Sequence, residues 1–162
     1  MKIQKYLFNA VLSIGIFTAI HAHTAEYIEG YPKIIDGDTI KIDGLNIRLA
    51  GIDALEKKQI CNYNSRKVEC GAESTRELIS IISARKVSCM YTKLDRYSRI
   101  LGTCFVDGKN INKTMVRNGY ALSYMSKEYS IDMIDAEQER KGIWKYDFQR
   151  PEDFRKKRWK RY

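Results

Sequence analysis

Histidine is almost absent from this chain. Its 162 residues include only His21 and His23, and both lie within the first 25 positions. The rest of the sequence therefore has no histidine general base, no paired-histidine ribonuclease site and no zinc site of the usual histidine-containing kind. Any hydrolytic chemistry here has to use carboxylates, arginines and a metal ion that prefers oxygen ligands.

Charge is absent from residues 6–20, a mostly apolar stretch that two lysines precede and that small residues follow at Ala22 and Ala25. This three-part pattern is typical of a secretory signal peptide, and the stretch is short for a membrane span. We expect a signal peptide over residues 1–22, with cleavage near 22–25, and a secreted or periplasmic protein. The alternative is an uncleaved anchor helix that tethers the protein to a membrane.

Cysteine is present in an even number, four, which behind a signal peptide predicts two disulfides formed in an oxidising compartment. Three connectivities are possible in principle. Cys61 and Cys70 flank a polar loop, whereas Cys89 and Cys104 lie in two strand-like runs that a turn would bring side by side. We expect these two pairs. The alternative, a four-cysteine zinc site, lacks the close C-x-x-C spacing that such sites use.

The positive charge is concentrated at one end of the chain. Cleavage of the signal peptide removes two of 29 basic residues and none of 20 acidic ones, which leaves a net charge of +7. Residues 149–162 carry seven basic and two acidic residues, or +5, interleaved with Phe154, Trp159 and Tyr162. This composition suits a polyanion whose bases can stack on aromatic rings. The alternative is a solvated and partly disordered C-terminal tail.

Internal repeats are absent, and the length fits one domain with a genuine core. Asp43-Gly44 separates two alternating runs, 39–42 and 45–49, and predicts a two-residue hairpin with Ile42 opposite Leu45. Strands are also predicted at 87–91 and 100–106. The expected helices are one from Gly71 with Thr75, Leu78, Ile79 and Ile82 on one face, one from the cap Asn110 to Gly119, and one from the cap Ser130 to Gly142.

Acidic side chains gather around this hairpin, at Asp36, Asp38, Asp53 and Glu56, together with Arg48. Carboxylates beside a strand are costly unless they bind something, which indicates a hard cation or a cationic group of a substrate. The alternative is that Asp36-Gly37-Asp38 is simply a turn.

A flat hairpin does not bring these side chains together. It places Asp38 opposite Leu49, puts Asp38 and Arg48 on opposite faces, and leaves Asp53 about 13 Å away along the strand, at roughly 3.3 Å per residue. Convergence needs a bulge or a sharp departure after Leu49, for which Ala50-Gly51 is suited.

Together these motifs resemble the staphylococcal nuclease-like (thermonuclease) family, in that family's order, over roughly residues 26–146. The resemblance rests on the segments Asp36–Thr39, Arg48–Glu56, Asp95-Arg96-Tyr97-Ser98-Arg99, Val116–Ala121, Ala136-Glu137 and Lys141–Trp144. It implies an α+β fold, a five-stranded OB-type β-barrel packed with about three helices, in a nuclease domain over residues 26–148.

The same resemblance implies a function. A family member is expected to be a monomeric, calcium-dependent endonuclease that hydrolyses phosphodiester bonds of DNA and RNA with low sequence specificity and leaves 3′-phosphate ends. The alternative, from a different class, is a barrel that binds nucleic acid without cutting it. The presence of the acidic and arginine positions that match the family argues against this alternative.

The resemblance also implies the metal ligands. These are the carboxylates of Asp38 and Asp53 and the backbone oxygen of Ala54, a set that suits the flexible coordination of calcium. Ala54 stands where the best-known relatives have threonine, which keeps the backbone ligand and removes a hydroxyl. Leu55 replaces the usual proline, which removes a constraint on this turn without removing a ligand.

Five further residues match positions that act on the substrate in the family. Glu56 corresponds to the glutamate that orients or deprotonates the attacking water. Arg48 and Arg99 correspond to arginines whose planar forks grip the phosphate, although surface salt bridging is the alternative for both. Tyr97 and Tyr124 correspond to positions near the bound nucleotide.

Overall fold

The computed structural model describes residues 26–95 and 97–159, so the expected signal peptide lies outside the described residues. The main sheet in the described part has seven strands in the order β1-β8-β9-β4-β3-β2, with β10 beside β9. Their bounds are β1 Glu26–Gly30, β2 Lys33–Ile34, β3 Thr39–Ile42, β4 Leu45–Leu49, β8 Val87–Leu94, β9 Ile100–Val106 and β10 Lys109–Asn110.

The hairpin between β3 and β4 forms as the sequence predicts. Ile42 lies opposite Leu45, and the backbone N–H of Leu49 donates to the carbonyl of Asp38 at 2.8 Å. Asp43 and Gly44 both have positive φ, 47° and 85°, as a type I′ turn requires.

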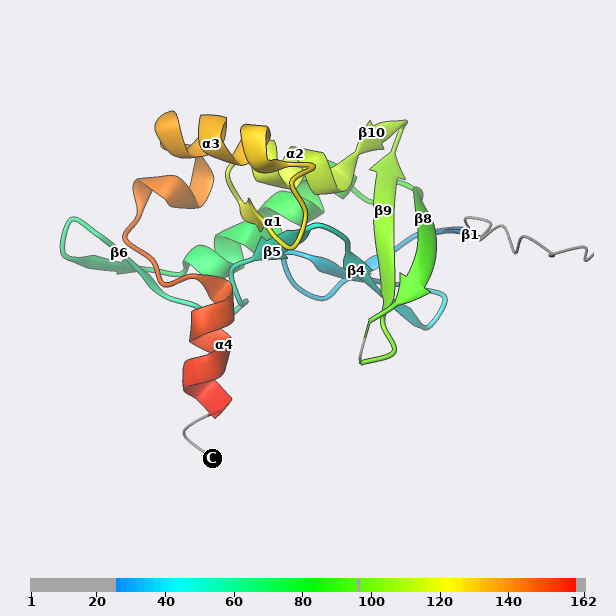
Figure 1. Ribbon diagram of the computed structural model, residues 1–162, viewed down its shortest axis with the longest axis horizontal. Helices are drawn as coiled ribbons and strands as arrows, with labels where there is room; N and C mark the ends of the chain where they lie inside the picture. Colours follow the sequence, from blue (N-terminus) through cyan, green and yellow to red (C-terminus); the bar gives the residue numbers. More distant parts are fainter. Residues whose placement is uncertain (1–25, 96, 160–162) are drawn as a thin grey trace, which may run out of the picture.

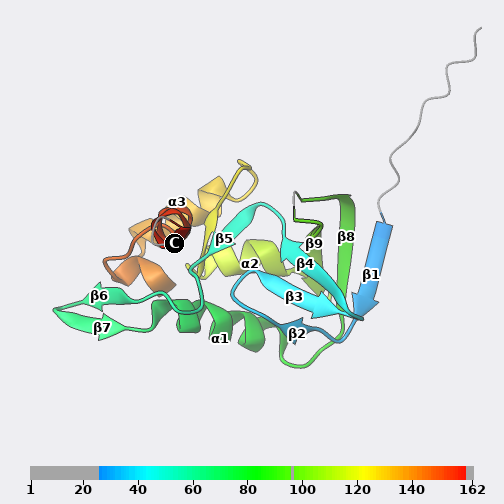
Figure 2. The same ribbon diagram turned by 90° about the horizontal axis from the view of Figure 1, so that it is seen from below.

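Strands β8 and β9 form the second antiparallel pair, and one face of β9 is buried at every other residue. Strand β9 also runs parallel to β4, which joins the two hairpins into one curled sheet (Figure 2). Cys89 and Cys104 are register partners and are joined by a disulfide, and Cys61 is joined to Cys70. Both predicted pairs are therefore present.

Two short two-stranded sheets complete the strand structure of the described chain. Strand β5 (Ile52–Ala54) pairs with β11 (Ala121–Ser123), and β6 (Cys61–Tyr63) pairs with β7 (Arg66–Val68). The β6–β7 hairpin projects from the end of the molecule opposite to β1 (Figures 1 and 2).

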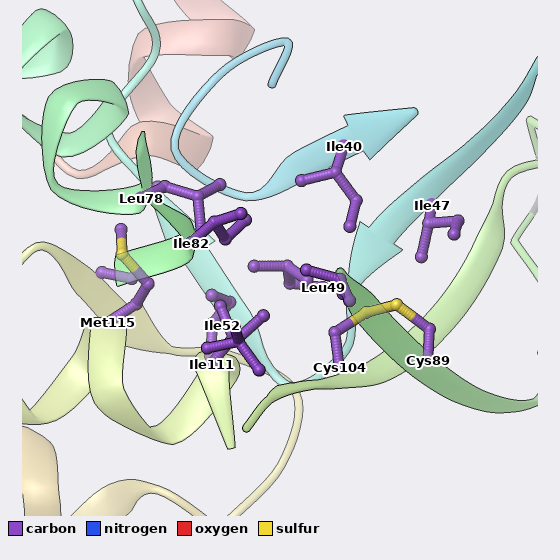
Figure 3. Packing of buried hydrophobic residues seen from close by; sticks show 14 of the residues in the cluster. Ile40, Ile47, Leu49, Ile52, Leu78, Ile82, Cys89, Cys104, Ile111 and Met115 are labelled. Atoms are coloured by element: carbon purple, nitrogen blue, oxygen red, sulfur yellow. A yellow bond between two sulfur atoms is a disulfide. The ribbon is translucent and has the colours of Figure 1, made fainter. Parts of the chain in front are cut away.

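Helices α1 (Cys70–Ile82), α2 (Ile111–Arg117) and α3 (Ser130–Gln138) group beside the sheet (Figure 1). The core lies between these helices and the sheet, where Leu78 and Ile82 of α1 face Ile40, Leu49 and the Cys89–Cys104 disulfide (Figure 3). A short 3-10 helix η1 (Gly142–Lys145) and a fourth helix α4 (Pro151–Trp159) follow. Among the described residues, none of the helices has the length and apolarity needed to cross a bilayer.

The expected α+β, OB-type architecture is confirmed, with differences at the edges. The sheet has more strands than the five expected, because β2 and β10 are two-residue segments too short to show a period in the sequence. Helix α4 was not predicted, because its run of charged residues lacks an apolar stripe.

Two details of the predicted helices are wrong, and one is right. Ile79 is 50 % exposed, since the buried face of α1 runs instead through Ser74, Thr75 and Leu78. The side chain of Ser130 does not cap α3, which begins after Tyr129 and ends at Gln138, before Gly142. The cap of α2 is as predicted, since the side chain of Asn110 accepts the N–H of Lys113 at 2.9 Å.

Candidate active site of carboxylates and arginines

Asp38 lies in the turn that leads into β3, and its carboxylate points into the protein. The side chain of Asp36 accepts the N–H of Asp38 at 3.1 Å, so Asp36-Gly37-Asp38 forms a turn, as the alternative interpretation of these acids expected. The Asp38 carboxylate accepts the backbone N–H of Ala54 at 2.8 Å and the hydroxyl of Thr39 at 3.1 Å. With 2 % of its surface exposed, Asp38 is a buried acid held against β5.

The chain bends sharply between β4 and β5, as the sequence predicted. Gly51 has a φ of +74°, a conformation that side-chain-bearing residues rarely adopt. The bend is tied to the rest of the fold by Asn112 of α2, which is fully buried. Its amide donates to the carbonyls of Ala50 at 2.8 Å and Gly102 at 3.0 Å, and its oxygen accepts the N–H of Cys104 at 3.0 Å.

Arg48 joins the two buried aspartates across this bend. One guanidinium nitrogen pairs with Oδ1 of Asp38, and the other pairs with Oδ1 of Asp53 at 2.6 Å. A flat hairpin would place the side chains of Asp38 and Arg48 on opposite faces of the sheet. This does not happen here because Asp38 lies in the turn before β3 and not in the strand itself. The bend after Leu49 brings Asp53 to the same guanidinium.

Glu56 is held at the edge of this group by a buried glutamine that no sequence pattern indicated. The side chain of Gln59 accepts the N–H of Glu56 at 3.2 Å, and the N–H of Gln59 donates to the carbonyl of Glu56 at 2.7 Å. The loop also packs on the start of α1, where a Cβ added to Gly71 would lie 1.8 Å from the Glu56 carbonyl oxygen. Only a glycine permits this approach.

Arg155 of α4 is the unexpected member of the site. Its two terminal nitrogens pair with both oxygens of Asp53, each at 2.9 Å, and one of them also pairs with Oε1 of Glu56 at 2.9 Å. Burial lowers the pKa of Arg155, but the hydrogen bonds and charges of Asp53 and Glu56 outweigh this effect, so the pKa is raised. Arg155 lies in the basic tail, where nothing in the sequence distinguishes it from its neighbours.

The structure does not bring all predicted residues together. Within the described chain, Arg99 pairs with Asp95, with its Nε 2.8 Å from Oδ2, and not with the carboxylates around Arg48. The Arg99 guanidinium also lies 5.5 Å from the centre of the Tyr97 ring, which is 62 % exposed. Tyr124 lies near one of the acids, since it lines a cavity of about 250 Å³ together with Asp53.

The electrostatics of the site depend on burial. The pKa of Asp38 is raised to about 7, chiefly by burial; the Arg48 charge and the Ala54 N–H oppose this rise, and the charges of Asp36 and Asp53 add to it. Asp38, Asp53 and Glu56 carry three negative charges when ionised, and Arg48 and Arg155 carry two positive charges. Without Arg155, the remaining charge would be −2, which matches a divalent cation.

The donor set fits a hard metal ion. The acids present oxygen atoms only, which are the ligands that hard metal ions prefer. The buried carboxylates of Asp38 and Asp53 both pair with the guanidinium of Arg48, so they lie on either side of one positively charged group. In the part of the chain that the structure describes, no three acidic, histidine or cysteine side chains form a ready-made cage. A metal ion would therefore need backbone or water oxygens to complete its coordination.

Comparison with known proteins agrees with this geometry. The family model described as "Staphylococcal nuclease homologue" matches residues 46–146. The succinoglycan biosynthesis protein ExoI of Rhizobium meliloti is 36 % identical over 143 residues, which cover 85 % of this chain and 74 % of that protein. An uncharacterized endonuclease of Escherichia coli is 36 % identical over 123 residues, covering 69 % of this chain and 73 % of the relative. The staphylococcal-like nuclease CAN1 of Arabidopsis thaliana is 25 % identical over 127 residues, covering 75 % of this chain and 36 % of that protein. Because the family model spans more than half of the chain, including Arg48, Asp53, Glu56 and Arg99, the chain belongs to the staphylococcal nuclease homologue family.

Proposed function

We propose that the protein is a calcium-dependent endonuclease that hydrolyses phosphodiester bonds of DNA and RNA with low sequence specificity and leaves 3′-phosphate ends. The observation that carries the proposal is the pair of buried carboxylates, Asp38 and Asp53, that share the guanidinium of Arg48. Buried acids of this kind are costly to the fold, and binding of a cation and a phosphate gives them a use. Family membership and the endonuclease relative support the same reaction.

Asp38, Asp53 and the carbonyl oxygen of Ala54 would hold the metal ion. Calcium bound there would lower the pKa of a coordinated water and offset negative charge on the phosphate. The hydrogen bonds to Asp38 from Ala54 and Thr39 fix the direction of its carboxylate before any metal arrives. Such fixed ligands need little rearrangement on binding, which favours affinity.

Glu56 would accept a proton from the attacking water. It is suited to this role because its side chain is 27 % exposed, unlike those of the two aspartates, and solvent can therefore reach it. The loop around Gln59 and Gly71 positions its backbone. The position of Glu56 beside Asp53 brings the base next to the site where the phosphate would lie.

Arg48 and Arg99 would bind the phosphate oxygens. A planar guanidinium matches two of these oxygens and stabilises the charge that grows in the transition state. Arg99 is paired with Asp95 in this structure, so it would have to turn from Asp95 toward the substrate. Tyr97 and Tyr124 would contact the nucleotide, the latter from the cavity beside Asp53.

Cleavage assays test this proposal. Purified mature protein should degrade both plasmid DNA and a labelled RNA in calcium and should lose this activity in excess chelator. Products should carry 3′-phosphates, detected by their failure to be extended by a polymerase until a phosphatase removes the phosphate. Binding of both nucleic acids without cleavage in any divalent metal would instead support the non-catalytic alternative.

The place of action is part of the same proposal. We infer export to a periplasmic or extracellular space from the expected signal peptide and from the two disulfides, which form in oxidising compartments. N-terminal sequencing of the mature protein tests it, because cleavage near residues 22–25 is expected and an intact N-terminus would indicate a membrane anchor.

A further inference from the structure

The geometry points to a displaceable latch: helix α4 closes the site by placing the Arg155 guanidinium against Asp53, where a divalent cation would bind, with a second contact to Glu56, and calcium binding releases it. This inference rests on the proposed function, since it takes Asp53 as a metal ligand. The contact joins residues 102 positions apart, so it is a tertiary contact and not a local helix interaction.

Arg155 occupies the oxygens that a cation at Asp53 would need. Oδ2 of Asp53 accepts one nitrogen of Arg155 at 2.9 Å, and Oδ1 is shared between Arg48 and Arg155. A metal ion bound to Oδ2, the oxygen of Asp53 that Arg48 does not contact, cannot coexist with the Arg155 guanidinium at hydrogen-bond distance, and the two positive charges also repel each other. Calcium binding and the docking of Arg155 therefore compete.

Beyond its first turn, α4 makes few contacts with the body of the molecule. Pro151, at its start, is buried, and the carbonyl of Gln149 accepts the side-chain amide of Gln59. Beyond this first turn, the described polar contacts of the helix with the body are the ion pairs of Arg155 with Asp53 and Glu56, while Lys156 pairs within the helix with Asp153. Figure 1 shows α4 standing out from the body of the molecule. Release of Arg155 would thus free most of the helix while Pro151 remains as a hinge.

The latch has a physical use in the metal-free protein. Without Arg155, the three acids and Arg48 would leave a charge of −2 in a partly buried site, which is unfavourable in the absence of a cation. Arg155 reduces this charge, and it pairs with Asp53 beside the cavity that Tyr124 lines. The site is thereby closed where calcium is scarce and opened where calcium is abundant.

Calcium binding and hydrogen exchange of α4 test the latch. Chelator-stripped mature protein would be compared with Arg155→Gln and with the control Lys157→Gln, which removes one exposed charge from the same helix. If the latch is closed in about nine of ten molecules, Arg155→Gln should bind calcium about tenfold more tightly by calorimetry. The control should match the wild type.

Hydrogen exchange gives a second readout that does not need activity. In the wild type, calcium should accelerate exchange in residues 151–159, and in Arg155→Gln this exchange should already be fast without calcium. A wild-type experiment that needs no variant is to raise salt from about 0.1 M to about 1 M, which shortens the screening length from about 10 Å to about 3 Å and should also accelerate exchange in α4.

The outcomes separate the latch from the proposed function. Unchanged or weaker calcium binding in Arg155→Gln, or a helix that calcium protects further, would overturn the latch and leave the nuclease assignment standing. Absence of calcium binding in every variant would overturn the metal assignment and the latch with it.

Discussion

Arg48 is the residue on which the geometry of the site converges. Its guanidinium contacts two buried carboxylates that come from different elements, one before β3 and one in β5. The planar fork of arginine can contact both acids and, in the proposed mechanism, still present donors to a phosphate, which a single ammonium nitrogen could not do.

Arg48→Lys should lower kcat/KM for DNA about 10²-fold to 10³-fold, the usual effect of losing a donor that stabilises transition-state charge. The control is Arg85→Lys, since Arg85 pairs with exposed Asp107 and not with the acids of the site. Steady-state cleavage of a labelled oligonucleotide measures both. Near-normal activity of Arg48→Lys would contradict the bidentate role.

Substitutions of Asp38 and of Glu56 are expected to impair different steps, calcium binding and catalysis respectively. Asp38→Ala should abolish calcium binding because it removes a ligand, whereas Glu56→Gln should keep calcium binding and lower kcat about 10²-fold to 10⁴-fold, the range for a general base. Calorimetry and single-turnover cleavage separate the two effects. Loss of calcium binding in Glu56→Gln would make Glu56 a ligand and not a base.

At the scale of elements, two close packings define the site. The bend between β4 and β5 is held by Asn112, and the loop that carries Glu56 rests on the first turn of α1 through Gly71. Helices α1 and α2 therefore contribute to the geometry of the site as well as to the core.

Gly71→Ala should destabilise the fold by about 1–3 kcal/mol or more, because the new Cβ would clash with a backbone oxygen that cannot move alone. It should also lower kcat by displacing Glu56. As a control, Gly44→Ala adds a Cβ with no atom within 4 Å, so only the cost of its positive φ, about 1–2 kcal/mol, remains. Urea denaturation measures both, and equal stability of Gly71→Ala and the wild type would show that the loop shifts freely.

The disulfides belong to this scale as well, since one joins β6 to α1 and the other joins β8 to β9. Mass mapping of non-reduced protein should recover Cys61–Cys70 and Cys89–Cys104. Replacing either pair by serines should cost roughly 2–4 kcal/mol under the loop-entropy model. Four free thiols in protein isolated from its native compartment would contradict both the pairing and the proposed export.

The sequence predicted the local features of this molecule and missed the long-range ones. The hairpin register, the Asn110 cap and the departure after Leu49 follow from turn chemistry and alternation. The roles assigned to the acids came from resemblance, because a flat ladder separates them. Asn112 and Arg155 were missed because their contacts, 62 and 102 residues away along the chain, leave no periodic signal.

At the scale of the whole molecule, the described part of the basic tail, helix α4, contacts the site. The tail carries +5 of the +7 expected after signal-peptide cleavage, and its helix contacts the carboxylates of Asp53 and Glu56. Removing the residues after Arg150 should, at saturating calcium, raise KM and flatten its salt dependence, with kcat nearly unchanged. The log–log slope should fall by about 0.7–0.9 for each phosphate that the tail neutralises in the intact protein. Salt titrations of KM test this; an unaltered slope would exclude the tail as an electrostatic arm, and a large fall in the melting temperature would show that it supports the fold.

The measurement that tests the central claim most directly is cleavage of a labelled DNA by chelator-stripped mature protein as calcium is added back, for the wild type and for Asp53→Asn. The wild type should be inactive without metal and should gain activity with a saturable dependence on calcium. Asp53→Asn should remain at least about 10²-fold slower at every calcium concentration, because it loses the negative charge of a proposed calcium ligand. The same carboxylate pairs with Arg48 and Arg155. Full cleavage by the stripped wild type, or equal rates for the two proteins, would contradict the assignment of these carboxylates to a calcium-dependent nuclease site.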